Sequence, residues 1–452
     1  MTSRKTDLPP GRLRAAPEGF LTAEDIAAVQ DGRRDFLAGA FRKALGAGVA
    51  LAAAQSATAR AAADAGDPAI LTMQPYNHTL GNPVAAHPYG LPSKYEHNLA
   101  RRESPGLSSI SQASVSFTPL QGLFGIITPS GLHFERHHGG WHDMDPSLHR
   151  LMVHGDVRAP RVYTMDDLLR LPSVSRIHFV ECGANSAMEW SNVAVPTVQY
   201  THGMLSCSEF TGVPVSILLD AVGIDPRKTP YVLAEGADSA SHARTIPIER
   251  LLDDAMVAYA MNGEMLRPEN GYPLRLIVPG LQGVSQVKWL RRLKVGNTPW
   301  DLRDESSQYS DLMPDGSARQ YTWIQECKSV ITSPSGGQML LDRGLYNISG
   351  VAWSGRGAIK RVDVSVDGGR NWQTATLQTP VLSKALTRFN FSWNWDGSPA
   401  ILQSRAIDET GYVQPKMNEL RAVRGSRSIY HNNAIQSWKV AESGEVSNVQ
   451  VY

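Results

Sequence analysis

The sequence predicts an α+β protein with two globular domains, a mixed α/β domain followed by an immunoglobulin-like β-sandwich. A chain of 452 residues is too long for one ordinary core, and 42% hydrophobic residues suffice to fill two. The 39 Gly and 28 Pro residues indicate many turns, which suit sheets better than helix bundles. Because 44 Lys plus Arg nearly balance 43 Asp plus Glu, the composition argues against nucleic acid or an anionic membrane as a partner.

Residues 1–63 are predicted to form a twin-arginine export signal. The segment Gly32-Arg33-Arg34-Asp35-Phe36-Leu37-Ala38 precedes an apolar stretch, from Leu45 to about Ala57, that is too short to span a bilayer. Small-residue cleavage sites follow at 57–59 and 61–63. Gly32 stands where Ser or Thr is usual in the motif, and Ala38 stands where Lys is usual. A simple amphipathic N-terminal arm is the alternative. The signal predicts a periplasmic protein that is exported already folded, often with its cofactor inserted.

The next two segments are predicted to be an arm and a domain. Residues 64–120 are expected to form an extended arm over the body, because repeated prolines break any helix. Residues 121–324 are expected to form the mixed α/β domain. Apolar runs typical of strands, such as 177–180 and 274–278, alternate there with helical patterns, and 164–169 opens with a capping-box sequence.

Residues 325–452 are predicted to form the β-sandwich, because strand patterns recur there about every 8 to 12 residues. Glycines in Asp367-Gly368-Gly369 favour a tight turn between two of these strands. The predicted strands cover residues 361–366, 372–377, 389–395 and 435–440. No internal repeat or low-complexity run follows the export signal.

Three cysteines exclude a disulfide-dense scaffold, and no C-x-x-C-H is present to attach a c-type haem. Cys182 directly follows a strand of buried type and precedes Gly-Ala-Asn, a typical place for an active-site turn. Its thiolate is a candidate metal ligand or nucleophile, although a small core residue is the alternative. Cys207 and Cys327 have no such setting and are either buried thiols or a pair.

Histidines are dense in the run from His133 to His142, and two pairs have the i,i+4 spacing of a helical zinc site. Glycines and aromatic residues interrupt the run, and the zincin pattern H-E-x-x-H is missing, so we do not expect zinc. A loop that offers a guanidinium and imidazoles is suited to an anionic group such as phosphate. A solvated polar loop is the alternative.

Two cations, Arg275 and Lys288, lie in a region punctuated by Gly and Pro. Cations seldom face a core without an anionic partner. Each is therefore expected either in an internal salt bridge or in contact with an anionic ligand.

Together these features, in this order, resemble the sulfite oxidase family of molybdenum enzymes from about residue 130 to the end of the chain. The tract Cys-Gly-Ala-Asn-Ser-Ala-Met-Glu-Trp and the tract from Lys328 to Gly337 are most similar to the SoxC branch, the molybdenum subunits of bacterial sulfane dehydrogenases. The matching blocks are His133–Gly140, Val180–Asn185, Ala258–Glu264, Gly271–Gly280, Val287–Leu290 and Val364–Gly369 with Trp372.

The resemblance implies a molybdenum ion carried by one molybdopterin, with Cys182 as the thiolate ligand to the metal. Arg136 would draw an anionic sulfur substrate towards the metal, and Tyr309 would lie beside the metal. Residues implied to surround the pterin and its phosphate are Phe134, Arg136, His138, Asp238, Asn270, Arg275, Ser285 and Lys288.

Departures from the family pattern bear on the substrate. Members that oxidise free sulfite usually carry two arginines where this chain has Ser186 and Ala187. Losing one charge-assisted contact to a small dianion costs about 1.5 to 3 kcal/mol, so free sulfite is expected to bind poorly. Asn270 replaces a usual histidine, which retains a hydrogen bond to the pterin but not an imidazolium charge.

The resemblance implies oxygen transfer from Mo(VI) to the sulfane sulfur of a cysteine persulfide on a SoxYZ-like carrier protein, within thiosulfate oxidation. Since the sequence has no haem motif, electrons are expected to pass to a dihaem c-type cytochrome subunit like SoxD. The C-terminal domain is expected to mediate homodimerisation within a heterotetramer. The alternatives are a periplasmic sulfite dehydrogenase that acts on free sulfite and a non-catalytic secreted binding protein without molybdenum.

Overall fold

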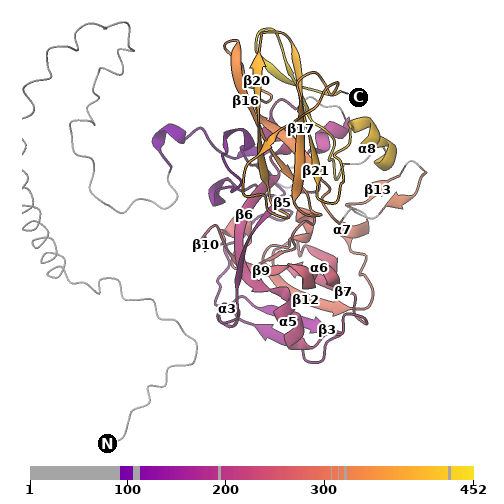
Figure 1. The fold of residues 1–452 in the computed structure, drawn as a ribbon. Coiled ribbons are helices and arrows are strands. Elements are labelled where there is room, and N and C mark those ends of the chain that lie inside the picture. The colour runs from indigo at the N-terminus through magenta and orange to yellow at the C-terminus, as the bar shows by residue number, and fades with distance from the viewer. Residues whose placement is uncertain are drawn as a thin grey trace, which may run out of the picture. The chain divides into compact units, whose positions relative to one another are not determined.

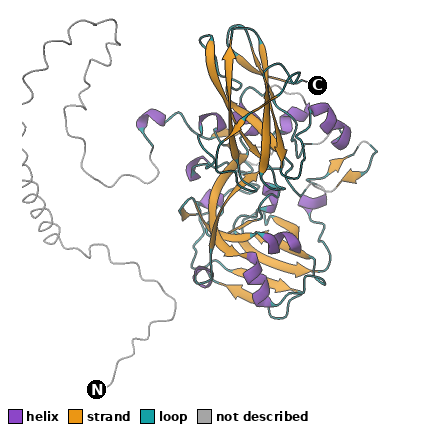
Figure 2. Cartoon of the chain, in the orientation of Figure 1, coloured by secondary structure: helices purple, strands orange, loops and turns teal. Residues whose placement is uncertain are grey.

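The structure is a computed structural model of the chain, and strands dominate the part that it describes, with short helices at their margins (Figures 1 and 2). The described residues are 92–104, 112–191, 195–306, 308–313, 315–319, 323–425 and 429–451. The predicted export signal and residues 64–91 and 105–111 of the predicted arm lie outside them. No helix of the described residues is long and apolar enough to cross a membrane.

Two five-stranded sheets form the N-terminal part of the described chain. The first has the order β10-β9-β6-β5, with β11 paired to β9, and the second has the order β4-β3-β12-β7-β8. All neighbouring strands in both sheets are antiparallel except β3 and β12, which are parallel. The strands of the first sheet are β5 (Val174–Glu181), β6 (Leu205–Pro214), β9 (Met256–Met261), β10 (Glu264–Met265) and β11 (Arg275–Ile277). Those of the second are β3 (Leu151–Gly155), β4 (Arg161–Tyr163), β7 (Tyr231–Gly236), β8 (Ala243–Pro247) and β12 (Leu290–Gly296).

Short helices connect these strands and cover the second sheet. Helix α5 buries Leu218 and Leu219 in the same apolar cluster as Leu151 and Leu293 of the sheet. The helices are α3 (Met165–Leu169), α4 (Val198–His202), α5 (Val215–Val222), α6 (Ile248–Asp253) and α7 (Arg303–Ser306). Single 3₁₀ turns are η2 (Lys94–Glu96), η3 (Leu120–Gly122), η4 (Ser130–Leu132), η5 (Ala187–Ser191), η6 (Pro268–Asn270) and η7 (Gly283–Ser285).

The capping box predicted at the start of 164–169 is confirmed. The backbone N–H of Asp167 donates to Thr164 Oγ1 at 3.1 Å, and the backbone N–H of Thr164 donates to Asp167 Oδ2 at 2.9 Å. Two donors that the first turn of a helix leaves unpaired are thereby satisfied. The strand predicted at 177–180 is confirmed as part of β5, and β11 forms the middle of the strand predicted at 274–278.

The C-terminal part forms the predicted sandwich of two antiparallel sheets, with the orders β15-β16-β20-β19 and β18-β17-β21-β22-β23. The first sheet contains β15 (Lys328–Ser333), β16 (Gly344–Trp353), β19 (Thr376–Leu377) and β20 (Thr387–Trp395). The second contains β17 (Ile359–Ser365), β18 (Gln373–Thr374), β21 (Ala400–Asp408), β22 (Ser437–Val440) and β23 (Val446–Val449), and α8 (Met417–Arg424) follows β21. The fold class is therefore as predicted, while the limits 121–324 and 325–452 stay a prediction.

One predicted strand is wrong in detail. Residues 372–377 do not form a single strand, because β18 pairs with β17 and β19 pairs with β20 in the opposite sheet. The chain changes sheets at Ala375, whose side chain is buried in the sandwich core. The predicted turn is present, and Gly368 and Gly369 both have positive φ, at 76° and 86°, where glycine carries no steric cost.

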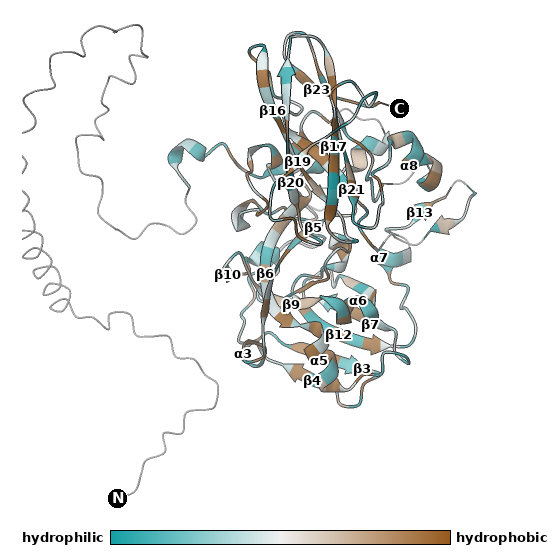
Figure 3. Ribbon diagram, in the orientation of Figure 1, coloured by the Kyte–Doolittle hydropathy of each residue, from teal (hydrophilic) through white to brown (hydrophobic). Residues whose placement is uncertain are grey.

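The two parts share one apolar cluster. Phe179, Leu205 and Cys207, on β5 and β6, belong to the same buried cluster as Trp353 and Phe389 of the sandwich. Apolar residues recur along the strands of both parts in Figure 3. Strand β5, which ends one residue before Cys182, is therefore packed directly against the C-terminal domain.

Two small hairpins complete the described chain. Strand β1 (Arg102–Ser104) pairs with β2 (Val115–Phe117), and β13 (Asp311–Leu312) pairs with β14 (Ala318–Arg319). The described part of the predicted arm is bonded to the body, because Gln199 Nε2 donates to the carbonyls of Ala100 and Phe117 at 3.0 and 2.9 Å.

Candidate active site

Cys182 lies at the end of β5, where the chain turns away from the sheet. Its backbone N–H donates to the Met204 carbonyl at 3.0 Å, and its carbonyl accepts from the Asn185 N–H at 2.9 Å, which closes the turn. The side chain is only 7% exposed and packs against Phe134 and Val180. Burial raises the pKa of the thiol, and the nearby Arg136 charge opposes that rise. A bound cation would favour the thiolate that burial disfavours.

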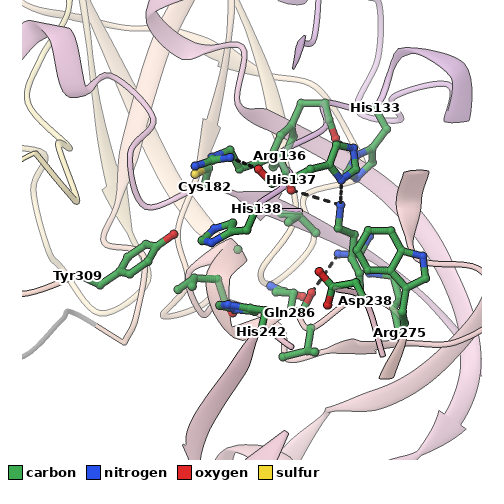
Figure 4. A pocket seen from close by; sticks show the side chains of 17 residues that line it. His133, Arg136, His137, His138, Cys182, Asp238, His242, Arg275, Gln286 and Tyr309 are labelled. Atoms are coloured by element: carbon green, nitrogen blue, oxygen red, sulfur yellow. Dashed lines mark hydrogen bonds between the residues drawn. The ribbon is translucent and has the colours of Figure 1, made fainter. Parts of the chain in front are cut away.

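A cavity of about 720 Å³, its open mouth included, lies against Cys182. Cys182 and Tyr309 lie at one end of it, and Asp238 and Arg275 lie towards the other, with His138 between them (Figure 4). Phe134, Arg136 and Lys288 also contribute to its wall. The structure thus brings together predicted residues from distant segments of the chain around one cavity.

Three cations of this wall, Arg136, Arg275 and Lys288, have no carboxylate oxygen within 4.0 Å among the described residues. Lys288 Nζ bonds to the Arg136 carbonyl at 3.2 Å, to the Glu269 carbonyl at 3.1 Å and to His137 Nδ1 at 2.9 Å. The Arg136 guanidinium donates to the His137 carbonyl. The internal salt bridge considered for Lys288 is therefore not formed.

Arg275 has the same kind of partners. Its guanidinium donates to the carbonyls of Asn270 and Gln286 at 3.0 and 3.4 Å. Burial lowers the pKa of Arg275 to about 10. Burial also lowers the pKa of Lys288 to about 7, and the charge of Arg275 adds to that effect. Positive charge that is held out of water without a carboxylate indicates an anionic ligand.

Buried polar atoms in the same region lack hydrogen-bond partners among the described residues. They are Arg275 Nε, Ser285 Oγ, Asp238 Oδ1, Asn270 Oδ1 and His133 Nε2. Buried polar groups in proteins are normally paired, so these five unpaired atoms, three of them on residues that line the cavity, indicate a polar ligand. Together with a soft thiol at one end, these atoms and cations fit an elongated, phosphorylated cofactor that carries a metal.

Asn270 and Ser285 are the two predicted cofactor residues that do not line the cavity. Both are 1% exposed. Asn270 is linked to the wall because its carbonyl accepts from Arg275, and Ser285 ends the turn η7, whose Gly283 and Val284 belong to the wall. Their unpaired side-chain oxygens keep them candidates for contact with a ligand.

His138 belongs to a network that the sequence did not indicate. Its ring lies 5.3 Å from that of His242, whose Nδ1 bonds to Asp304 Oδ2 at 2.9 Å and whose Nε2 bonds to the Val284 carbonyl at 2.8 Å. Burial, followed by the charge of His242, lowers the pKa of His138 to about 4, so its imidazole is neutral at physiological pH. The side chains of His138, His242 and Asp304 are close enough to bind a metal ion, but both ring nitrogens of His242 are already hydrogen-bonded.

Tyr309 is 7% exposed and stacks on Tyr430, with 4.5 Å between ring centroids and 24° between ring planes. Figure 4 shows its hydroxyl directed towards the side of the cavity where Cys182 and His138 lie. Burial raises the pKa of Tyr309, and Cys182 and Tyr430 add to the rise. Tyr430 comes from the C-terminal part of the chain, and no motif in the sequence indicated it.

The site and the fold agree with comparisons to known proteins. Residues 138–302 match the family described as oxidoreductase molybdopterin binding domain, and residues 319–438 match the Mo-co oxidoreductase dimerisation domain. Sulfite oxidase of Gallus gallus is 30% identical over 340 residues, which cover 69% of this chain and 73% of that protein. This chain belongs to the sulfite oxidase family. The resemblance found in the sequence is thereby confirmed, and with it a molybdopterin-binding oxidoreductase domain.

Other relatives in the family and a solved structure support this placement. Mitochondrial sulfite oxidase of Mus musculus is 33% identical over 346 residues, which cover 69% of this chain and 62% of that protein. NADPH nitrate reductase of Phytophthora infestans is 29% identical over 309 residues, 61% of this chain but only 34% of that longer protein. The crystal structure of the sulfane dehydrogenase SoxCD from Paracoccus pantotrophus matches with a TM-score of 0.83 and 48% identity, covering 86% of this chain and 100% of that one.

The lowered pKa of Lys288 predicts how an anion binds to cofactor-free protein. Above a pH of about 7 the Lys288 ammonium loses its proton. An anion that binds only the charged form must then bind together with a proton taken up by Lys288, which weakens its apparent affinity as pH rises. Affinity for inorganic phosphate should therefore fall between about pH 7.5 and 9.5, by up to about tenfold per pH unit, as measured by ³¹P NMR titration. Lys288→Arg should remove this dependence because arginine stays charged. An equal fall in the arginine variant would contradict the assignment.

Proposed function

We propose that this protein is the molybdenum subunit of a sulfane dehydrogenase, which oxidises the outer sulfur of a persulfide carried on a cysteine of a carrier protein. The observation that carries the proposal is the cavity that joins a buried thiol to three cations without carboxylate partners among the described residues. The likeness to SoxCD, at 48% identity over 86% of this chain, supports the choice of substrate class.

Cys182 would hold the metal, and the cationic end of the cavity would hold the phosphate of one molybdopterin. Phe134 and His138 would contact the pterin between those ends, together with Asp238. Arg275 and Lys288 would bind the phosphate, and the unpaired oxygens of Asn270 and Ser285 are placed to complete the contacts. When bound, the molybdenum centre supplies oxygen-atom transfer and accepts two electrons.

Arg136 would attract and orient the substrate. Its guanidinium donates to the neighbouring His137 carbonyl, has no carboxylate within 4.0 Å among the described residues, and is close enough to Cys182 to influence its thiol. A fixed cation in a partly desolvated cavity stabilises negative charge on an oxidised sulfur group more strongly than water does. Tyr309, whose raised pKa keeps it protonated, would donate a hydrogen bond from the same end of the cavity.

The surroundings of Ser186 favour a tethered substrate over free sulfite. Ser186 is 5% exposed, and Lys328 donates to its hydroxyl at 3.0 Å, so this position supplies no cation to the cavity. A small dianion would depend mainly on Arg136 at this end. A persulfide on a carrier protein gains further affinity from the docked protein surface, which compensates for a weaker contact at the sulfur.

The proposal requires partners. Electrons would pass to a dihaem c-type cytochrome subunit like SoxD, and the substrate would arrive on a sulfur carrier like SoxYZ. The C-terminal domain, which matches the dimerisation family, would join two such subunits into a heterotetramer. We place the complex in the periplasm, after export by the twin-arginine pathway, on the basis of the sequence of residues 1–63.

The variant Cys182→Ser tests the metal ligand. Serine has nearly the same volume as cysteine, so the fold should be retained, but a hydroxyl is a poor ligand where a soft thiolate is required. We expect loss of activity by more than about 10³-fold and a reduced molybdenum content by elemental analysis. Cys207→Ser is a suitable comparison, because Cys207 is fully buried in a separate apolar cluster. A fully active Cys182→Ser enzyme would contradict the assignment of Cys182 as the metal ligand.

The choice of substrate is tested by steady-state reduction of cytochrome c with two donors. We expect a persulfidated carrier protein to be oxidised with a kcat/KM at least about 10-fold above that of free sulfite, given the missing second cation. Arg136→Gln should lower kcat/KM for both donors, since both present negative charge at the metal. Faster turnover of sulfite than of the persulfide would instead favour a sulfite dehydrogenase, and protein without molybdenum would favour a binding protein.

A further inference from the structure

The turn that carries Cys182 is held from the C-terminal domain through Glu181. The carboxylate of Glu181 is buried, and its Oε1 accepts from Lys328 Nζ at 3.1 Å and from Asn185 Nδ2 at 2.9 Å. Its Oε2 accepts from Trp353 Nε1 at 2.7 Å, and its backbone carbonyl accepts from Gln325 Nε2 at 3.2 Å. Three of these four donors lie beyond residue 324, in the first strands of the sandwich or just before them.

The residues that follow Cys182 are held from the same side. The Gly183 carbonyl accepts from the His431 N–H at 2.7 Å, and the Ser186 carbonyl accepts from Asn432 Nδ2 at 3.3 Å. The Ser186 hydroxyl accepts from Lys328 Nζ at 3.0 Å. One ammonium group therefore bonds to the residue before Cys182 and to a residue four positions after it.

Lys328 is fully enclosed at this place. Its side chain is 2% exposed, and its ammonium lies 5.6 Å from the centre of the Trp353 ring. Burial of a lysine requires that its charge and donors be satisfied, which Glu181 and Ser186 provide here. Lys328 is also the first residue of the tract to Gly337 that resembles the SoxC branch in sequence. The contacts proposed above for the cofactor and the substrate do not include Lys328.

We propose that Lys328 is a positioning residue for the metal ligand: by bonding to Glu181 and Ser186 on either side of Cys182, it sets the direction in which the thiol enters the cavity. This inference rests on the proposed role of Cys182. It adds a task to the C-terminal domain, which would build part of the metal site as well as a dimer interface.

The physical reason lies in what remains when the ammonium is removed. Glu181 would be a buried carboxylate without its ion-pair partner, so its contacts with Trp353 and Asn185 must rearrange. That rearrangement alters the hydrogen bonds next to Cys182 and shifts its backbone. A shift of the order of 1 Å at a reacting group lowers turnover by as much as about 10²-fold.

The test uses the full chain with Lys328→Met, Glu181→Gln and the double substitution. The matched control is Lys360→Met, because Lys360 is an exposed lysine on β17 of the same domain. The first measurement is the rate at which iodoacetamide alkylates Cys182 in cofactor-free protein. Cys207 and Cys327, which are both 0% exposed, serve as internal references for global opening. The second is the Mo(V) EPR spectrum of the loaded enzyme, together with kcat and KM.

We expect Lys328→Met to change the alkylation rate of Cys182 alone, to shift the Mo(V) g-values and to lower kcat by about 10- to 100-fold with a nearly constant KM. The double variant should regain thermal stability, because no buried charge is left unpaired, without regaining the wild-type spectrum. Lys360→Met should match the wild type in every measurement.

A folded Lys328→Met protein with wild-type alkylation and g-values would overturn the proposal, since a purely structural role would leave both unchanged. Where neither Lys328 variant folds, Ser186→Ala removes one of the two bonds that flank Cys182 and leaves the ion pair intact. A changed alkylation rate in that variant supports the proposal, and an unchanged rate contradicts it. None of these results depends on which sulfur compound is oxidised, whereas wild-type protein without molybdenum would refute the proposed function itself.

Discussion

Positive charge without a carboxylate partner is the constraint around which this site is arranged. Arg275 is buried and bonds only to carbonyl oxygens among the described residues, and Lys288 has carbonyls and one imidazole. The lowered pKa of each shows what this arrangement costs in the absence of a ligand. An anion in the cavity removes that cost, so the free energy of binding the cofactor includes the relief of burying these two cations, and to a lesser extent of their mutual repulsion.

The thiol is constrained in the opposite sense. Burial disfavours the thiolate of Cys182 until a cation is present. One end of the cavity therefore holds uncompensated positive charge, and the other holds a thiol that needs a cation to ionise. A single ligand that is anionic at one end and carries a metal at the other satisfies both. The fold makes this possible because β5 delivers Cys182 to the boundary with the sandwich, while Arg275 and Lys288 come from β11 and the loop before β12. The separation of Cys182 and Arg275 is therefore set by the sheet that β5 and β11 share, whereas Lys288 is placed by a loop.

Local patterns in the sequence were sufficient for some of these features and insufficient for others. Cys182 could be singled out because a strand and a Gly-containing turn are readable from neighbouring residues, and the capping box at Thr164 is equally local. The pairing of His242 with Asp304 joins residues 62 positions apart, and nothing in either segment marks it. Tyr430 on Tyr309 is a similar case. The division of 372–377 between two sheets also depends on tertiary packing, because the pattern of a short strand does not reveal its partner.

Ser186 belongs to the support of the site rather than to the wall of the cavity. Its hydroxyl accepts from Lys328, and neither residue lines the cavity, so the cation next to this loop contacts the protein and not the cavity. Since Lys328 is neutralised by Glu181, it contributes little field to the cavity. Arg136 is a cation of the cavity wall without a carboxylate partner among the described residues, so it remains available to an anionic ligand. The proposed substrate, which would bring a docking surface of its own, would depend less on further charge at this end of the cavity.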